Sequence, residues 1–175
     1  LLHLLVLKAL NPATCDFVSD PISGRRDLAR SLGADGAFDP SSTRWLDSVL
    51  DMSSGAGVDT VFDTVGGTLT LSQGLRATRE GGTVILFAHS KPGELASFDI
   101  NSVFKHERRI IATYSGGLTE QDRIFELLQS KAFDPSPLVS HRLPFSEFDS
   151  AVELSRRHLA QKILLYPDRS DHSNA

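Results

Sequence analysis

The chain has 175 residues, of which 40% are hydrophobic and 23% charged, and its formal net charge is −4. This composition excludes overall disorder and suits one globular domain, or one domain with part of another. The 18 basic residues are outnumbered by 22 acidic ones and form no basic block, so nothing indicates binding to nucleic acid or to an anionic membrane. We expect a small-molecule partner.

The N-terminal stretch and the single cysteine bear on where the protein acts. Cys15 is the only cysteine of the sequence. A disulfide framework and a cysteine zinc cluster are therefore excluded, and a reducing cytoplasm is the simplest compartment. Residues 1–10, "LLHLLVLKAL", lack a basic leader and a cleavage site, which favours a buried helix over a targeting signal. Because residue 1 is Leu, we expect the chain to begin inside a longer protein.

Strands and helices alternate through the first part of the chain. Residues 14–20, "TCDFVSD", predict a buried strand that ends at Asp20 and is followed by a Pro-Gly turn. A helix is expected over residues 25–32, with Gly33 just past its end. A short strand at residues 36–38, a helix around residues 45–50 and a strand at residues 58–63 follow.

The alternation continues to the C-terminus. We expect a helix over residues 68–79, a turn at residues 80–82 and a strand over residues 83–88, "TVILFA". Later elements are predicted as strands at residues 109–114 and 162–166, helices from residue 118 and at residues 146–156, and a frayed tail from residue 167. The strands up to residue 88 are apolar runs rather than polar-apolar alternations, which indicates a parallel sheet covered by helices on both faces.

Several loops should converge at one edge of this sheet, because ligands of open parallel sheets bind beyond the carboxyl ends of the strands. Asp20, Val65-Gly66 and Ala88-His89 all follow strand ends. An acid such as Asp20 can accept hydrogen bonds from the ribose of a dinucleotide, and its charge would repel a 2′-phosphate, so it favours NAD over NADP. Arg25 or Arg26 could offset this repulsion, or could equally well pair with the ribose or with Asp20 itself. It can equally well be a turn residue before Pro21. The glycine-rich pyrophosphate turn that should accompany a ribose acid is absent from the sequence.

The order of motifs resembles the cofactor-binding half of the medium-chain, zinc-dependent alcohol dehydrogenases, nearest to the sorbitol and threonine dehydrogenase branch. The motifs are "SDPISGRRDLARSLGAD", "GVDTVFDTVGG", "GGTVILFA", "ATYSGG" and "PLVSHRLPFSEFDSAVEL...KILLYP". The resemblance implies a Rossmann-like, doubly wound parallel α/β sheet that lacks its first strand. It implies an NAD-binding domain at residues 1–113, a segment of the GroES-like catalytic domain at residues 114–167, and a flexible tail at residues 168–175.

The resemblance also implies roles for individual residues. Asp20 corresponds to the ribose-binding acid and Arg25 to the basic residue beside the adenosine. Val65 and Gly66 correspond to the turn that passes the ribose and pyrophosphate. The nicotinamide side would be met by the backbone of Ala88 and His89, with Tyr114 nearby.

Neither a zinc site nor a catalytic residue is expected within this chain. In the family the zinc ligands come mainly from an N-terminal domain that this sequence lacks, and zinc acts there as a Lewis acid on the alcohol oxygen. The histidines show no metal-ligand spacing. They are His3, His89, His106, His141, His158 and His172.

The function implied is the cofactor-binding portion of an NAD-dependent, zinc-dependent alcohol or polyol dehydrogenase with a small alcohol as substrate. The resemblance further implies a homo-oligomer in which residues 109–114 pair with their copy. Two alternatives stay open: a non-catalytic nucleotide-binding or interaction module derived from the family, and a methyltransferase-like Rossmann domain.

Overall fold

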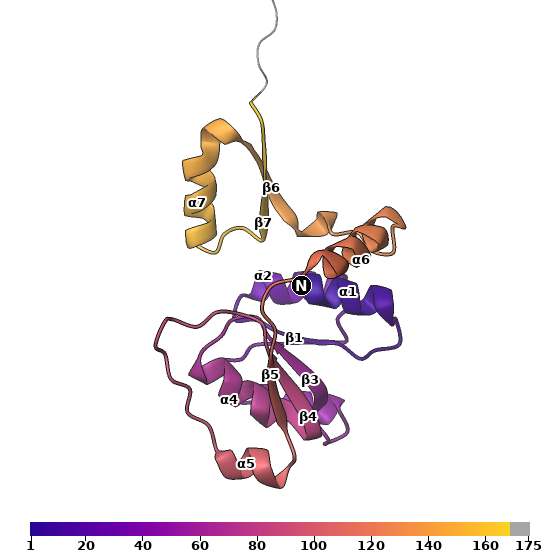
Figure 1. The fold of residues 1–175 in the computed structure, drawn as a ribbon, viewed down its shortest axis with the longest axis vertical. Helices are drawn as coiled ribbons and strands as arrows, with labels where there is room; N and C mark the ends of the chain where they lie inside the picture. Colours follow the sequence, from indigo (N-terminus) through magenta and orange to yellow (C-terminus); the bar gives the residue numbers. More distant parts are fainter. Residues whose placement is uncertain (169–175) are drawn as a thin grey trace, which may run out of the picture. The chain divides into compact units, whose positions relative to one another are not determined.

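The computed structural model describes residues 1–168, and the chain divides into two compact units (Figure 1). One unit comprises Ala13–Ile124, and the other combines Leu1–Pro12 with the chain from Phe125 onward. The division falls within helix α6, Leu118–Gln129. The predicted tail lies, from residue 169 on, outside the described residues. The predicted domain boundaries stay predictions.

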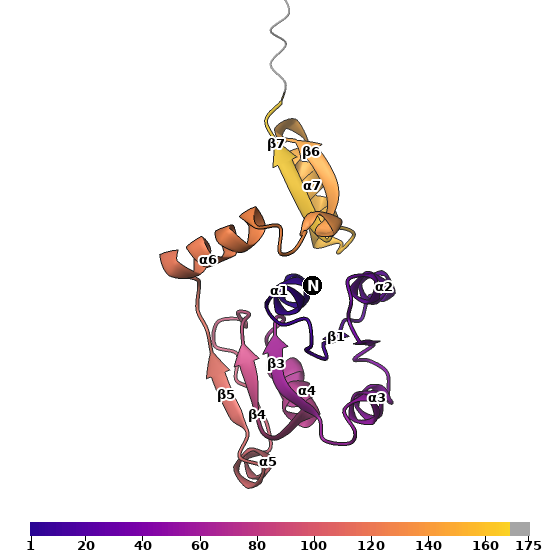
Figure 2. The same ribbon diagram turned by 90° about the vertical axis from the view of Figure 1, so that its right-hand side faces the viewer.

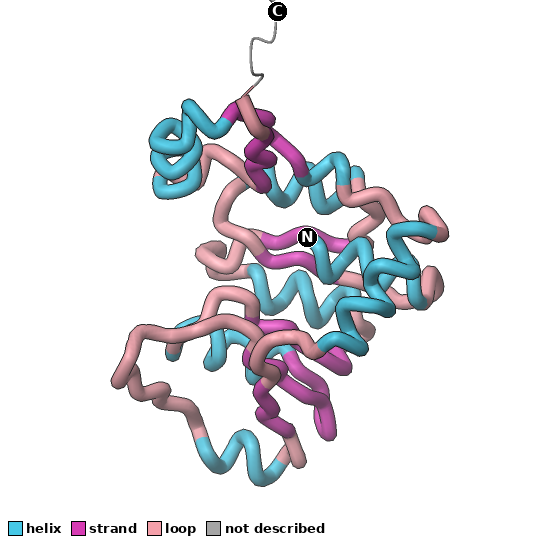
Figure 3. The backbone as a smooth tube through the Cα atoms, turned by 45° about the horizontal axis from the view of Figure 1, so that its top comes forward, coloured by secondary structure: helices cyan, strands magenta, loops and turns pink. Residues whose placement is uncertain are grey.

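The unit Ala13–Ile124 alternates strands and helices (Figure 3). Its elements are β1 Phe17–Ser19, α2 Ser23–Ser31, β2 Gly36–Phe38, α3 Trp45–Met52, β3 Val58–Asp63, α4 Thr68–Ala77, β4 Thr78–Leu86, α5 Ile100–Lys105 and β5 Arg109–Ala112, followed by the start of α6. All strand pairs are parallel. The predicted α/β class is confirmed, since each strand of a parallel pair is connected to its neighbour by a segment that contains a helix.

The strands of this unit form two hydrogen-bonded sheets, β1-β2 and β3-β4-β5. Figure 2 shows β3, β4 and β5 side by side, with β4 in the middle. In the doubly wound strand order 3-2-1-4-5-6, the first strand lies between the second and the fourth. The break between β1 and β3 falls at that position, in keeping with the predicted lack of a first strand.

The core of the larger sheet is formed by α4 packing on β4. Leu71, Leu75 and Val84 are buried together. Helix and sheet approach closely at Gly74, where an added Cβ would meet Val61 at 3.3 Å and Val84 at 3.4 Å. The Gln73 side-chain amide donates to the Pro40 carbonyl at 3.1 Å and ties α4 to the loop after β2.

One sequence expectation is wrong in detail. Helix α4 ends at Ala77 and β4 begins at Thr78, so the predicted turn at residues 80–82 is an irregularity inside the strand. The cause is tertiary, because Thr78 already pairs with Val58 of β3. Within the chain segment itself, the Thr78 hydroxyl donates to the Gly74 carbonyl at 2.6 Å. Strand β5 is an edge strand with three of four residues exposed.

The unit formed by Leu1–Pro12 and the chain from Phe125 is smaller. It contains α1 Leu2–Leu10, the second part of α6, a 3-10 turn Ser136–Leu138, β6 Val139–Pro144, a 3-10 turn Phe145–Glu147, α7 Phe148–Arg156 and β7 Lys162–Tyr166. Strands β6 and β7 pair in parallel, and α7 connects them. Helix α7 and strand β7 agree closely with the helix predicted at residues 146–156 and the strand predicted at residues 162–166, whereas β6 was not predicted.

Candidate functional site

The turn after β3 is organised by the carboxylate of Asp63. One oxygen, Oδ1, accepts hydrogen bonds from the backbone N–H of Val65 at 3.1 Å and of Gly66 at 2.9 Å. The other, Oδ2, accepts from the Thr70 hydroxyl on the first turn of α4 at 2.9 Å. The whole residue is only 5% exposed. A buried carboxylate is costly unless it is hydrogen-bonded, and here three donors satisfy it.

Gly66 brings this turn against the loop after β4. Its φ is +82°, and a Cβ at this position would lie 2.9 Å from the His89 carbonyl oxygen. Further along, the Thr68 hydroxyl donates to the Leu95 carbonyl at 3.0 Å. Only glycine combines this backbone conformation with so close an approach. The Val65-Gly66 turn and the His89 loop are therefore direct neighbours.

The ends of β4 and β5 complete this group. The Asp63 carbonyl accepts from the N–H groups of Phe87 at 3.0 Å and Ala88 at 3.2 Å. The His89 and Tyr114 rings meet edge to face, with centroids 5.6 Å apart and planes at 90°. Tyr114 is 81% exposed, so the pair borders on solvent. The structure thus brings together five sequence-predicted residues, which we call the strand-end cluster: Val65, Gly66, Ala88, His89 and Tyr114.

Asp20 directly follows β1, which belongs to the other sheet, and Arg25 lies in the first turn of α2. Asp20 Oδ1 accepts from the Ile22 N–H at 2.8 Å, which makes the turn that the sequence allowed as an alternative role. Asp20 Oδ2 lies 3.7 Å from Arg25 Nη1, and the two side chains are 23% and 24% exposed. The turn role and a ribose role are compatible, because only one carboxylate oxygen serves the turn.

A second arginine ties the ends of β1 and β2 together. Arg26 Nη1 donates to the Asp20 carbonyl at 2.7 Å and lies 3.4 Å from Asp39 Oδ2. The Ser41 hydroxyl and backbone N–H donate to Asp39 and, with a smaller contribution from Arg26, lower the pKa of its carboxyl below the ordinary 3.8. Sequence analysis considered Arg26 as a partner of Asp20 or of the ribose but did not predict its contact with Asp39.

The described residues do not fit a zinc site. Within residues 1–168, no three His, Cys, Asp or Glu side chains gather closely enough to hold a metal ion. Across the same residues, no helix is long and apolar enough to cross a membrane.

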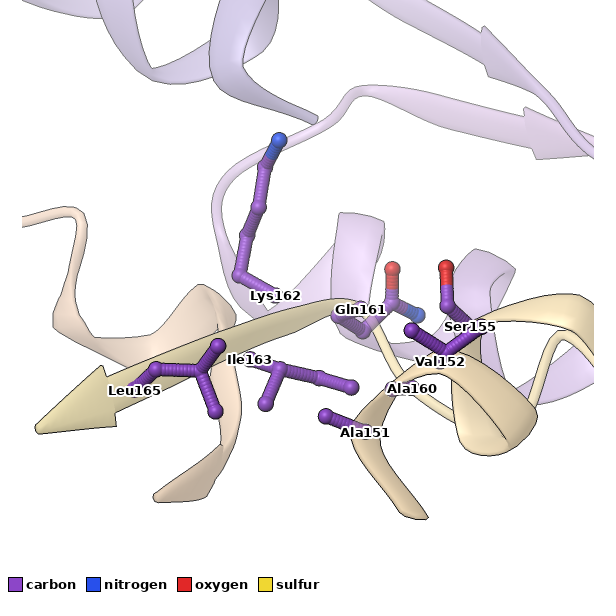
Figure 4. Close-up of a pocket in the computed structure, with 8 residues that line it drawn as sticks. All are labelled: Ala151, Val152, Ser155, Ala160, Gln161, Lys162, Ile163 and Leu165. Carbon is purple, nitrogen blue, oxygen red and sulfur yellow. The ribbon is translucent and has the colours of Figure 1, made fainter. Parts of the chain in front are cut away.

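A shallow pocket lies in the smaller unit, between α7 and β7 (Figure 4). Its lining is mainly small or aliphatic, with Lys162 as its only charged side chain. The residues that line it are Ala151, Val152, Ser155, Ala160, Gln161, Lys162, Ile163 and Leu165. None of them is a sequence-predicted site residue, and the pocket carries no cluster of reactive groups.

Asp63 and Thr70 are the organising residues that sequence analysis missed. A signal was present in "FDTVGGTLT", where an acid at a strand end precedes two glycines and a threonine one helical turn beyond them. Asp and Asn side chains commonly accept from backbone N–H groups two residues on, so the local bonds could have been expected. The bonds to Phe87 and Ala88 come from the next strand and leave no local trace in the sequence.

Parallel strands with functional loops gathered at their carboxyl ends define a nucleotide-binding class of α/β fold. Residues 9–130, well over half of the chain, match the family described as "Zinc-binding dehydrogenase". The chain therefore belongs to the zinc-binding dehydrogenase family, and the resemblance found in its sequence is confirmed.

Known proteins agree with this assignment. L-threonine 3-dehydrogenase of Thermococcus kodakarensis is 30% identical over 159 residues, which cover 87% of this chain and 44% of that protein. The structure of alcohol dehydrogenase TADH from Thermus sp. ATN1 superimposes with a TM-score of 0.85 at 27% identity, covering 96% of this chain and 48% of that one. Benzyl alcohol dehydrogenase from Acinetobacter calcoaceticus, at 22% identity and a TM-score of 0.84, shares the fold. The chain spans less than half the length of these proteins.

Proposed function

We propose that the chain is the cofactor-binding portion of an NAD-dependent, zinc-dependent dehydrogenase that oxidises an alcohol or polyol to a ketone or aldehyde. Membership of the zinc-binding dehydrogenase family supports the reaction class. The observation that carries the cofactor role is the contact of the Gly66 turn with the His89 loop, where a Cβ on Gly66 would stand 2.9 Å from the His89 carbonyl oxygen. Loops from adjacent parallel strands meet where this fold class binds nucleotides.

The adenosine half of the cofactor would bind at the end of β1. Asp20 would accept hydrogen bonds from the ribose hydroxyls, which are worth about 1.5–3 kcal/mol each when the acceptor is charged. Arg25, 3.7 Å from the Asp20 carboxylate, would lie beside the adenosine. A 2′-phosphate about 4 Å from Asp20 would be repelled by about 4 kcal/mol at an effective dielectric of 20, so the site would favour NAD over NADP.

The nicotinamide half would bind at the strand-end cluster. The Val65-Gly66 turn would pass the ribose and pyrophosphate, and the backbone after β4 would meet the carboxamide, with the His89–Tyr114 ring pair beside it. Bound NAD supplies the hydride acceptor. The task of this chain's residues would be to hold and orient it, because reaction depends on a reactive geometry of the bound groups.

Three further parts of the proposal concern the surroundings of the site. Residues 114–167 would belong to the catalytic domain, and the zinc ligands would come from outside the described residues. The outer edge of β5 pairs with no strand among the described residues, so a second copy could extend the sheet there and form a homo-oligomer. We place the protein in the cytoplasm, in keeping with its single cysteine.

Calorimetric titration of the whole protein with NAD, NADP and S-adenosylmethionine tests the cofactor role. We expect NAD to bind and to bind more tightly than NADP. Binding of S-adenosylmethionine without NAD would overturn the proposal in favour of the methyltransferase-like alternative. NAD binding without NADH formation from simple alcohols, polyols or threonine would instead support the non-catalytic module.

A further inference from the structure

Asp63 links the two turns of the candidate nicotinamide site through both its side chain and its backbone. The carboxylate accepts from Val65, Gly66 and Thr70, as described above. Its carbonyl oxygen accepts from the backbone N–H groups of Phe87 and Ala88. One residue thus receives five hydrogen bonds from the turn after β3, from α4 and from the loop after β4.

These hydrogen bonds hold the turn after β3 in one conformation. Gly66 is held at φ +82° by the bond from its N–H to Asp63 Oδ1. Thr70 anchors Oδ2 from the helix, so the carboxylate cannot rotate away from the turn. Because the carboxylate is buried, loss of the Thr70 hydroxyl would leave Oδ2 without this donor, and the carboxylate and the turn bonded to it would shift to satisfy that oxygen.

We propose that Asp63 is the positioning residue for the nicotinamide half of the cofactor. It would touch no cofactor atom itself and would act through the backbone of Val65, Gly66 and Ala88. The inference rests on the proposed function, and it adds a residue that the cofactor-contacting set does not include. Its consequence is selective: disturbing Asp63 should weaken the binding of NAD but not of AMP, which carries only the adenosine end.

The mildest test removes one donor. Thr70→Val deletes the hydroxyl that bonds Asp63 Oδ2 and keeps the shape of the side chain. Thr78→Val is the matched control. The Thr70 hydroxyl also contacts the Gly67 carbonyl at 3.2 Å, and the Thr78 hydroxyl, at the other end of α4, likewise bonds a backbone carbonyl, that of Gly74. We expect Thr70→Val to raise the Kd for NAD roughly tenfold and Thr78→Val to leave it unchanged.

Asp63 itself is tested by a pair of variants. The Asn side chain of Asp63→Asn keeps an oxygen for the two turn N–H groups, and its amide can donate to the Thr70 hydroxyl, which can also accept. Asp63→Ala removes every side-chain bond. We expect Asp63→Asn to bind NAD within roughly threefold of the unchanged protein, and Asp63→Ala, where it folds, to bind it at least tenfold more weakly.

The readouts are the Kd values for NAD and AMP measured on the whole protein, with the melting temperature of each variant recorded alongside. A rise in the Kd for NAD alone in Thr70→Val, with Asp63→Asn close to normal, supports positioning. Equal losses for NAD and AMP, or a change of NAD affinity in Thr78→Val as large as in Thr70→Val, would reduce Asp63 to a folding role. If the unchanged protein binds neither ligand, the proposed function fails before this inference is reached.

Discussion

The two ends of the candidate cofactor site are built in different ways. At the strand-end cluster, a buried carboxylate and a left-handed glycine hold backbone groups in place. At the end of β1, the partly exposed side chains of Asp20 and Arg25 carry opposite charges 3.7 Å apart. The first arrangement determines geometry, because buried hydrogen bonds hold a conformation firmly. The second determines chemical preference, because exposed charges contribute little to stability but discriminate between charged ligands.

The largest effect should follow from disturbing the buried end at Gly66. Gly66→Ala adds a Cβ that meets the His89 carbonyl oxygen at 2.9 Å while the residue keeps a left-handed backbone. Gly33→Ala is the matched control, since Gly33 has φ +93° but open space around its Cβ position. We expect Gly33→Ala to lower the free energy of unfolding by about 1–2 kcal/mol, and Gly66→Ala to lower it further.

Urea unfolding and NAD titration of both variants check this prediction. Only Gly66→Ala should weaken NAD binding as well. Equal behaviour of the two variants would mean that the close approach of the two turns has no role in the site.

A smaller and more selective effect is expected at the charged end. Asp20→Asn keeps an oxygen for the Ile22 N–H and removes only the charge. NAD binding should weaken roughly tenfold, NADP binding should not weaken, and unfolding should change by less than about 1 kcal/mol. Calorimetric Kd values for the two cofactors measure the ratio. An unchanged preference for NAD would mean that Asp20 serves only the turn.

The smallest effect concerns pH. The folded pKa of Asp39 is lowered below 3.8, mainly by the Ser41 hydroxyl and N–H. The stabilisation from this group is therefore fully present above pH 3.8 and is lost as the pH falls through the folded pKa. Asp39→Asn should flatten the acid side of the stability profile measured by urea unfolding between about pH 2 and 5. If the stability profiles of the variant and of the unchanged protein are parallel, the ionised Asp39 carboxylate does not stabilise the folded protein.

Most elements could be predicted because their causes are local. Gly33 marks the end of α2, and the apolar runs of residues 58–63 and 162–166 coincide with β3 and β7. The start of β4 could not be predicted in the same way. Thr78 follows a helix without an intervening turn, and its extended conformation depends on pairing with Val58.

In the candidate site, too, features with local causes could be predicted and features that depend on tertiary contacts could not. The strand-end positions of Asp20, Gly66 and His89 could be predicted from the order of strands and turns. The ring contact between His89 and Tyr114 could not, because the two residues belong to the ends of different strands. The contact of Arg26 with Asp39 could not be predicted either, because Asp39 follows β2 and approaches Arg26 only when β1 and β2 pair.

The sequence by itself determined the alternation of strands and helices, the acid at the end of β1 and the glycine turn after β3, because periodicity, turn chemistry and charge are local properties of the chain. Only the tertiary structure decided that Asp63 joins the turn after β3 to the loop after β4. Its partners include backbone N–H groups, which every non-proline residue carries, so no residue type marks them. They meet at this carboxylate because parallel strands end at the same edge of a sheet.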